Sequence, residues 1–381
     1  MSAHAGPQPE IRGSDGDRLL PDKDRGDRCA RRQVEQAVQS SIRLSRPLSR
    51  NNIRERAVGP ILWAARAPSC RLIAVAIIKS ESEYPSHVST ALVTGALGHA
   101  GGHLARRVAD GGLTVRALVR TDEQARVARQ QGWEAVRGDL TDLDTLSPAL
   151  DGVDFVVHAA AYTGDSAPLS KSVNVDGTRE LAERALEAGV RRFVQISTMS
   201  VYGDPIPPEV DEESALATTD PEPYCATKAL AELELVMVRS RGLPVAILRP
   251  GMITHWVGSQ WGNEMVERIR ATGWPEFLHP DDVMPWVHTE NLAEMVWLCL
   301  THATAPDEAF IAADCNVNFR DFYGPVAMAL DRPMRTPSRA PTVSSGRIGK
   351  IGATLGYRPR FSFEETVARL VELAKHPAGS R

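Results

Sequence analysis

The sequence contains few cysteines and little excess charge of either sign. Its five cysteines are scattered and odd in number, without a C-x-x-C pair, which argues against a disulfide framework or a structural zinc site. We therefore predict no metal site and a reducing, cytoplasmic location. The formal net charge is −4 and the sequence pI is about 6.2, so no broad positive field is present to attract nucleic acid or an anionic membrane.

Long hydrophobic runs are also missing. A helix that spans a bilayer needs about 20 consecutive, mostly apolar residues. The nearest candidate, residues 61–78, is interrupted by Arg66 and Arg71. We therefore expect a soluble protein with no membrane partner, and 381 residues are enough to bury a sizeable core.

The first 85 residues differ in composition from the rest. They are rich in Arg, Asp, Ser, Gly and Pro and lack sustained periodicity, so they cannot bury enough apolar surface to offset ordering entropy. We expect residues 1–85 to be a disordered extension, or the result of a translation start placed too early, with Val88 as the alternative start. A transit peptide is a third interpretation, but acids such as Asp15, Asp17 and Asp22 argue against it.

Residues 90–104, TALVTGALGHAGGHL, contain a series of glycines between an apolar run and an amphipathic segment. Gly95, Gly98 and Gly101 allow a tight turn and let backbone N–H groups approach a pyrophosphate. The predicted helix at 102–108 would add the positive end of its dipole. This strand–turn–helix context predicts a dinucleotide-binding loop, with a purely structural turn as the alternative.

Further apolar segments alternate with helical patterns, the order typical of a parallel sheet covered by helices on both faces. The segments expected as strands are residues 113–120, 133–136, 155–158, 192–197 and 245–250. Residues 86–250 are therefore predicted to form an α/β domain with a Rossmann-type, doubly wound parallel sheet. We interpret His158, at the end of one strand, as a core histidine with satisfied hydrogen bonds.

Arg120 ends the second predicted strand. In a dinucleotide fold that prefers NAD, an acidic residue at this point binds the ribose hydroxyls. A guanidinium instead suits a 2′-phosphate, which it can hold with paired hydrogen bonds. NADP is therefore the predicted cofactor and NAD the alternative, unless Arg120 is merely a solvated arginine at a strand end.

Tyr224 and Lys228 are four residues apart, so they share one face of the helix predicted there. A phenol with a pKa near 10 is a poor acid or base at neutral pH. A nearby ammonium favours the phenolate and lowers the pKa of the phenol. The pair therefore predicts acid–base chemistry, although an isolated Y-x-x-x-K can also be an ordinary surface pair.

The T-G-x-x-G-x-x-G loop and the Y-x-x-x-K pair together resemble the short-chain dehydrogenase/reductase superfamily in its extended and atypical branches. In detail the chain resembles the NAD-dependent epimerase/dehydratase family and its 3β-hydroxysteroid dehydrogenase-like members, over residues 88–381. The resemblance implies a smaller C-terminal, substrate-binding lobe at 251–381. It also implies that a strand near 285–289 returns to the main sheet, and a homodimer formed through the helices near 173–189 and 224–239.

The resemblance also implies residue roles. Tyr224 would be the acid or base on the substrate oxygen, Lys228 would bind the nicotinamide ribose, and Thr198 would orient the substrate carbonyl, with Ser197 as fallback. Asn174 would support a water relay to the lysine. The residues implied to bind the cofactor are Thr94, Gly95, Gly98, Gly101, Arg120, Asp139, Leu140, Ala159, Ala160, Lys228 and Pro250.

Two departures from the family pattern bear on the reaction. Met284 stands where sugar-nucleotide enzymes carry a diphosphate-binding arginine, and Met199 and Ser200 replace the acid pair of the dehydratases. We therefore expect an NADP-dependent oxidoreductase acting on a ketone, aldehyde or secondary alcohol, with a small-molecule substrate that can be apolar. The alternatives are a sugar-nucleotide epimerase with tightly bound NAD and a non-catalytic dinucleotide sensor or scaffold.

Overall fold

The computed structural model describes residues 88–302 and 308–376, which belong to one compact unit. The expectations about residues 1–85 concern a segment outside the described residues. Among the described residues, no helix combines the length and the apolar character needed to cross a membrane.

A seven-stranded, fully parallel sheet forms the larger part of this unit, in the order β3-β2-β1-β4-β5-β6-β9. Every residue of β1 is buried, as expected for a strand covered on both faces. The predicted Rossmann-type sheet is therefore confirmed. Its strands are β1 (Thr90–Thr94), β2 (Thr114–Val119), β3 (Glu134–Arg137), β4 (Phe155–His158), β5 (Arg192–Ile196), β6 (Val245–Pro250) and β9 (Ala309–Ala312).

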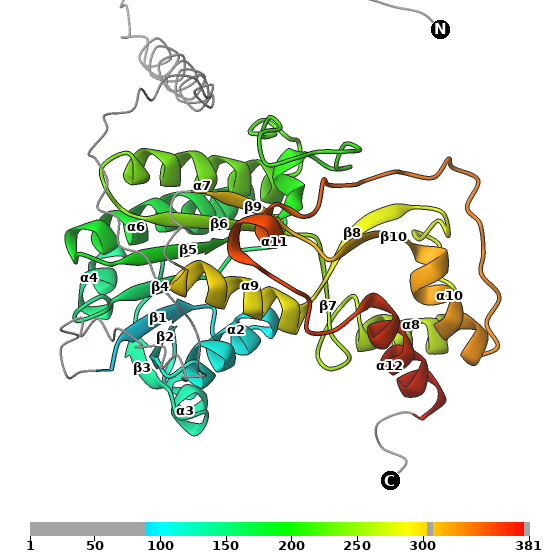
Figure 1. Cartoon of the computed structure of the whole chain (residues 1–381), viewed down its shortest axis with the longest axis horizontal. Helices are drawn as coiled ribbons and strands as arrows, with labels where there is room; N and C mark the ends of the chain where they lie inside the picture. The colour runs from blue at the N-terminus through cyan, green and yellow to red at the C-terminus, as the bar shows by residue number, and fades with distance from the viewer. Residues whose placement is uncertain (1–87, 303–307, 377–381) are drawn as a thin grey trace, which may run out of the picture. The chain divides into compact units, whose positions relative to one another are not determined.

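Helices cover both faces of the sheet, each over its own apolar core. One core lies under α2 (His99–Asp110), α3 (Asp122–Gln130), α9 (Thr289–Thr301) and α11 (Lys350–Leu355). Figure 1 shows α2 and α9 side by side, and the two helices are in contact. The other core lies under α4 (Leu146–Ala149), α6 (Gly177–Glu187) and α7 (Pro223–Arg239). Short helical segments complete this part: η1 (Leu143–Thr145), α5 (Ala167–Ser170), η2 (Lys171–Asp176) and η3 (Met199–Tyr202).

A second sheet, in the order β10-β8-β7, starts directly after β6. It carries a third core, which contains Trp286, Phe322 and Leu370, and lies beside α8, α10 and α12 in Figure 1. Its elements are β7 (Met252–Thr254), α8 (Asn263–Thr272), β8 (Val283–His288), β10 (Cys315–Asn318), α10 (Phe319–Ala329) and α12 (Phe363–Lys375). The division at residue 250 into a cofactor domain and a substrate lobe stays a prediction.

The strand expected at 285–289 does not return to the main sheet, and this prediction was wrong. The segment forms β8, which pairs in parallel with β7 and antiparallel with β10. The place beside β6 is taken by β9, a strand not predicted from the sequence. Trp286 faces the third core, whereas Val287 packs against the first core, so β8 joins two cores without entering the large sheet. Helix α9 follows β8 directly.

Candidate active site

The glycine loop between β1 and α2 has the tight geometry predicted for it. Gly95 has a φ of +68°, and a Cβ atom at this residue would lie 2.8 Å from the backbone nitrogen of Ala160. A Cβ atom at Gly101 would lie 2.0 Å from the carbonyl oxygen of Gly95. Gly98 is the N-cap of α2 and supplies no capping side chain, so the first N–H groups of the helix remain for an anionic ligand.

Thr94 joins the ends of β1 and β4. Its Oγ1 atom lies 2.7 Å from Nδ1 of His158 and accepts a hydrogen bond from the backbone N–H of Ala160 at 3.1 Å. The other ring nitrogen of His158 lies 2.9 Å from Oγ1 of Thr178. Burial lowers the pKa of His158 to about 3, so the ring is neutral. The interpretation of His158 as a satisfied core histidine is confirmed, and Ala159 and Ala160 lie directly beside the glycine loop.

The residues predicted for the adenosine half of the cofactor follow β2 and β3. Arg120 is exposed, and within the described part of the chain its guanidinium has no ion-pair or hydrogen-bond partner. The carboxylate of Asp139 accepts hydrogen bonds from the N–H and the hydroxyl of Thr141 through one oxygen, Oδ1. Leu140 is buried against Gly177 at the start of α6.

Tyr224 and Thr198 come together near the carboxyl end of β5. Tyr224 lies in the first turn of α7, and Thr198 follows β5 as the N-cap of η3. Both side chains line the same cavity, and the Thr198 side chain acts to lower the pKa of the Tyr224 phenol. Thr198 Oγ1 also accepts the N–H of Ser200 at 3.1 Å, which fixes the threonine rotamer. Two residues predicted from motifs 26 positions apart are thus brought together.

Lys228 lies one turn further along α7 and is buried. Its Nζ atom donates a hydrogen bond to the carbonyl oxygen of Ile196 at 2.8 Å. Burial lowers the pKa of Lys228 to about 8, against the opposing influence of Glu232. Burial also raises the pKa of Tyr224 to about 12, with the Thr198 hydrogen bond acting in the opposite direction. The pKa of the phenol therefore shifts opposite to the direction expected from the sequence, because in this geometry burial outweighs any influence of the ammonium.

Asn174 lies in the π-helical turn η2, a helix distortion often found at functional sites. Its side chain accepts the N–H of Tyr162 at 2.7 Å and donates to the carbonyl oxygen of the same residue at 2.9 Å. It also donates to the hydroxyls of Ser170 and Thr227. Thr227 precedes Lys228, so the Asn174 amide supports the helix turn that carries the lysine.

Ser197, the fallback for Thr198, has a different environment. Its hydroxyl is buried and donates to the carboxylate of Glu232 at 2.5 Å. Glu232 is at the same time paired with Arg249 at 2.6 Å. Ser197 thus belongs to a buried polar network with Glu232 and Arg249, whereas the side chain that acts on the Tyr224 phenol is that of Thr198.

A cavity of about 640 Å³ is lined by Tyr224, Thr198 and Ser197. It extends from His99 at the start of α2 to Tyr224 and Thr198, and Pro250 forms part of its wall. Much of the remaining wall is apolar, contributed by Ile206, Met252, Ile253, Trp261 and Met284. This volume is in the range of small-molecule sites.

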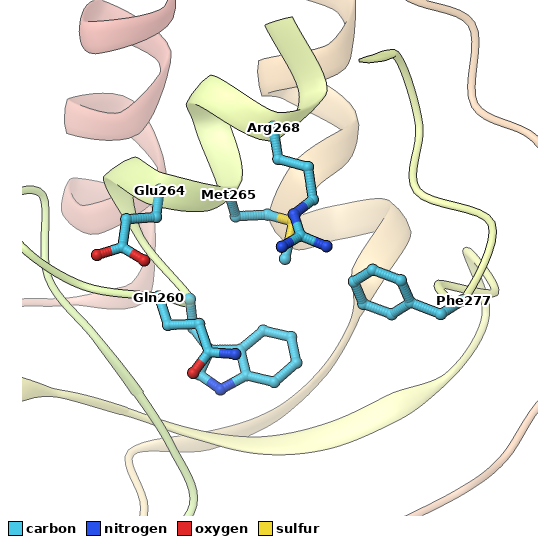
Figure 2. Close-up of a pocket in the computed structure, with 6 residues that line it drawn as sticks. Gln260, Glu264, Met265, Arg268 and Phe277 are labelled. Atoms are coloured by element: carbon cyan, nitrogen blue, oxygen red, sulfur yellow. The ribbon is translucent and has the colours of Figure 1, made fainter. Parts of the chain in front are cut away.

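A smaller recess of about 80 Å³ shares Gln260, Trp261 and Glu264 with the cavity wall. Figure 2 shows the remaining lining side chains, with Arg268 of α8 and Phe277 on the same side of the recess. The Arg268 guanidinium carbon lies 5.6 Å from the centre of the Phe277 ring, a distance at which a cation is attracted to the ring face.

A cluster of histidines beside the glycine loop was not predicted from the sequence. His99 and His103 lie on α2, His255 follows β7, and His288 ends β8, next to Glu290 in α9. The ring centres of His103 and His255 are 4.4 Å apart, and those of His255 and His288 are 5.2 Å apart. The spacing of His99 and His103, four residues on one helix, was the available signal. The partners of these residues are more than 150 positions away in the sequence.

The fold and these residues define a dinucleotide-binding protein of the short-chain dehydrogenase/reductase type. Residues 91–313, more than half of the chain, match the model of the NAD dependent epimerase/dehydratase family. The chain belongs to this family, as the motifs predicted.

Three relatives illustrate the similarity. Sterol demethylase protein B of Methylococcus capsulatus is 37% identical over 171 residues, which cover 43% of this chain and 51% of the relative. A 4-hydroxy-2-methyl-3-oxo-4-farnesyl-3,4-dihydroquinoline-1-oxide ketoreductase of Stigmatella aurantiaca is 28% identical over 233 residues, 60% of this chain and 70% of the relative. A 3 beta-hydroxysteroid dehydrogenase/Delta 5-->4-isomerase of Mycobacterium tuberculosis is 30% identical over 202 residues, 48% of this chain and 50% of the relative. The match thus spans only about half of the Methylococcus and Mycobacterium proteins.

Among solved structures, the dTDP-glucose 4,6-dehydratase of Streptomyces venezuelae with NAD bound has a TM-score of 0.64 and 28% identity. The superposition covers 74% of this chain and 96% of that chain. The UDP-glucose 4-epimerase of Thermotoga maritima has the same TM-score, 0.64, at 18% identity, which shows the fold alone.

Proposed function

We propose that this protein is an NADP-dependent oxidoreductase that transfers hydride between the nicotinamide and a ketone, an aldehyde or a secondary alcohol. The pair of Tyr224 and Thr198, whose side chains both line the cavity, carries the proposal. It presents two hydroxyls, one of them a phenol that can donate a proton, where a carbonyl oxygen can accept hydrogen bonds from both.

Each of these residues has a separate role in the reduction. NADPH, when bound, supplies the hydride. Tyr224 donates its phenolic proton to the carbonyl oxygen, and Thr198 orients that oxygen with a second hydrogen bond. Lys228 binds the nicotinamide ribose after turning from Ile196, and its charge beside the phenol then favours the phenolate that proton donation leaves behind. Asn174 positions the helix turn that carries the lysine.

The cofactor residues are supported by geometry and by charge. The loop of Gly95, Gly98 and Gly101, with the start of α2, would hold the pyrophosphate, while Thr94, Ala159, Ala160 and Pro250 border the nicotinamide half. Arg120, whose guanidinium has no partner within the described residues, would hold the 2′-phosphate of NADP. Asp139 and Leu140 would contact the adenine.

An apolar small molecule is the substrate class that the cavity fits best. Its wall contains Met284 where a sugar-nucleotide enzyme would hold a diphosphate with an arginine, and it adds Trp261, Ile206 and Met252. The names of two relatives, which refer to a sterol and to a farnesylated quinoline, support this class. A homodimer through α6 and α7, which pack against each other, and a cytoplasmic location stay predictions.

A sugar-nucleotide epimerase or dehydratase with retained NAD is the second candidate. The similarity to the Streptomyces venezuelae dehydratase, at 28% identity over nearly the whole of that chain, favours it. Arg120, Met284 and the absence of an acid pair at Met199 and Ser200 argue against it.

The deciding experiment measures the cofactor. The purified full chain is first assayed for nucleotide that co-purifies with it, and is then titrated with NADPH and NADH while energy transfer from tryptophan to the nicotinamide is followed. We expect a site free of retained NAD and a lower Kd for NADPH by about tenfold or more, the value of a hydrogen bond to a charged group. Tightly retained NAD would instead favour the sugar-nucleotide epimerase as the function of this protein.

Two variants test whether Arg120 causes the preference for NADPH over NADH. Arg120→Ala should raise the Kd for NADPH to near that for NADH and leave NADH binding unchanged. Arg126→Ala, on the exposed face of α3 and paired with Glu123, is the matched control and should change neither. An equal loss of both cofactors in Arg120→Ala would refute the 2′-phosphate role.

A further inference from the structure

We propose that His103, His255 and Glu290 form a binding site for a divalent transition-metal ion, best suited to Zn²⁺, which ties α2 to the segment after β7 and to the start of α9. Two imidazoles and one carboxylate make up a common zinc donor set. The cysteine pattern, from which we predicted no metal site, has no bearing on a site built of histidine.

The three side chains already converge on one point. One donor atom from each lies within 4.8 Å of those of the other two. His103 Nδ1 is 2.6 Å from Glu290 Oε1, and the rings of His103 and His255 are 4.4 Å apart at their centres. Zinc binds nitrogen at about 2.0–2.1 Å, so two donors on one tetrahedral ion lie roughly 3.3 Å apart, a spacing between the 2.6 Å of His103 and Glu290 and the 4.8 Å limit of the whole set.

Neighbouring groups orient the ligands in the way found around metal sites. His255 Nδ1 lies 3.0 Å from the backbone nitrogen and 3.2 Å from the carbonyl oxygen of Val257, and the tautomer that donates to this carbonyl has Nε2 as its ligand atom. Ligating histidines commonly donate their other N–H to a backbone carbonyl. Arg360 approaches the second carboxylate oxygen of Glu290, Oε2, at 4.0 Å, and leaves Oε1 for the ion.

His288 supplies an independent indication that this region holds a further group. It is fully buried next to His255, and within the described residues its Nε2 atom has no hydrogen-bond partner. Buried polar atoms without a partner are rare and call for an explanation, such as an ion or water. Four of the ten histidines of the chain, His99 and His288 included, lie in this one cluster.

An ion could reach this site from solvent, and its binding would affect the wall of the cavity. The side chains of His103 and Glu290 are 12% and 24% exposed, so the donors can be reached from solvent. His99, one turn before His103, and Ser259, four residues after His255, both line the cavity. An ion here would hold the start of α2 against the cavity wall. Because only three protein ligands are present and Arg106 acts on His255 electrostatically, we expect weaker binding than at a closed four-ligand site.

The test uses the full chain without an affinity tag, treated with EDTA and then dialysed against ZnCl₂. We expect one zinc per chain in the wild type and in the control His376→Gln, which changes an exposed histidine after α12. His103→Gln and Glu290→Gln should each weaken zinc binding at least about tenfold, because even the loss of a partner behind a ligand costs that much. Less than one zinc per chain in the wild type, or unchanged binding in both variants, would overturn the proposal.

Cobalt provides a readout that does not depend on how well the variants fold. Wild-type protein loaded with Co²⁺ should show visible bands of tetrahedral or five-coordinate cobalt, without the near-ultraviolet band of sulfur ligation. A sulfur band would place the ion on a cysteine instead, and would also overturn the proposal. Circular dichroism of each variant, compared with the wild type, shows whether lost binding reflects the site or the fold.

Discussion

Arg249 and Glu232 form a buried, two-point ion pair near the carboxyl ends of β5 and β6. Nη2 and Nε of Arg249 lie 2.6 and 3.0 Å from Oε2 of Glu232, and the two side chains are only 6% and 2% exposed. Glu232 also accepts the hydroxyl of Ser197, and Arg249 donates to the hydroxyl oxygen of Tyr202 at 2.7 Å. The pair therefore joins the end of β5, η3, α7 and β6, the elements that carry Thr198, Tyr224 and Lys228.

The first prediction concerns the stability that depends on this pair. Arg249→Met leaves the Glu232 carboxylate buried without its partner, so the free energy of unfolding should fall by about 3–5 kcal/mol. Arg320→Met is the matched control: its ion pair with Asp281 is nearly half exposed, and its loss should cost no more than about 1 kcal/mol. Urea unfolding of both variants measures the difference. Equal losses would show that the buried pair contributes no more than a surface pair.

The second prediction separates two neighbouring glycines. Gly101→Ala places a methyl group 2.0 Å from the carbonyl oxygen of Gly95, so the glycine loop must move and cofactor binding should be lost. Gly102→Ala meets no atom closer than 3.4 Å, and alanine inside a helix stabilises it by about 0.5–1 kcal/mol. Tryptophan-to-nicotinamide energy transfer and thermal unfolding of both variants check this. Cofactor binding by Gly101→Ala at the wild-type level would refute the role of the loop.

The third prediction tests the phenol. Tyr224→Phe removes the proton donor and should lower kcat by about 10²- to 10⁴-fold, the usual contribution of a general acid, with the cofactor Kd nearly unchanged. Thr198→Ser keeps a hydroxyl next to Tyr224 and should retain most of the activity, whereas Thr198→Val should lose most of it. Steady-state kinetics with a carbonyl substrate identified by screening measures both effects. Wild-type turnover in Tyr224→Phe would show that Tyr224 is not the proton donor.

Local sequence signals predicted the large sheet and pointed to a candidate site. Short apolar runs predicted six of the strands, and the glycine loop and the Tyr224–Lys228 pair indicated the two halves of the candidate site. These features depend on residues close together in the sequence. The proximity of Tyr224 and Thr198 then follows from the topology, because the carboxyl end of β5 and the first turn of α7 lie beside the same cavity.

The features that the sequence did not predict depend on distant residues. Residues 283–288 are apolar toward both faces, so the pattern could not tell a strand of the large sheet from one of a second sheet. The pairing of Arg249 with Glu232 was hidden because a charged residue within an apolar strand carries no local sign of its partner. The direction of the Tyr224 pKa shift was also out of reach, because it depends on how deeply the fold buries the phenol.

The last prediction follows from the burial of Lys228. Its ammonium has been moved out of water, and its hydrogen-bond acceptor, the carbonyl oxygen of Ile196, also accepts a hydrogen bond from the side chain of Gln195. Lys228→Met keeps the volume and removes the buried charge without leaving that oxygen unpaired. The variant should therefore be inactive when assayed with cofactor. Without cofactor, its free energy of unfolding at pH 7 should exceed that of the wild type by on the order of 1–3 kcal/mol.

The stability difference between the wild type and Lys228→Met should depend on pH, because burial lowers the pKa of Lys228. The pKa of Lys228 is lowered from 10.5 in the unfolded chain to about 8 in the folded protein, so between these values the unfolded state binds more protons. The stability of the wild type relative to Lys228→Met should therefore rise with pH from about 8 to 10.5. Below pH 8 both states carry the charge, and the full advantage of the variant should be present. Urea unfolding at pH 7, 9 and about 10.5 checks the trend. A difference that is independent of pH, or a variant less stable than the wild type at pH 7, would show that the buried ammonium is fully compensated by Glu232 and the Ile196 carbonyl.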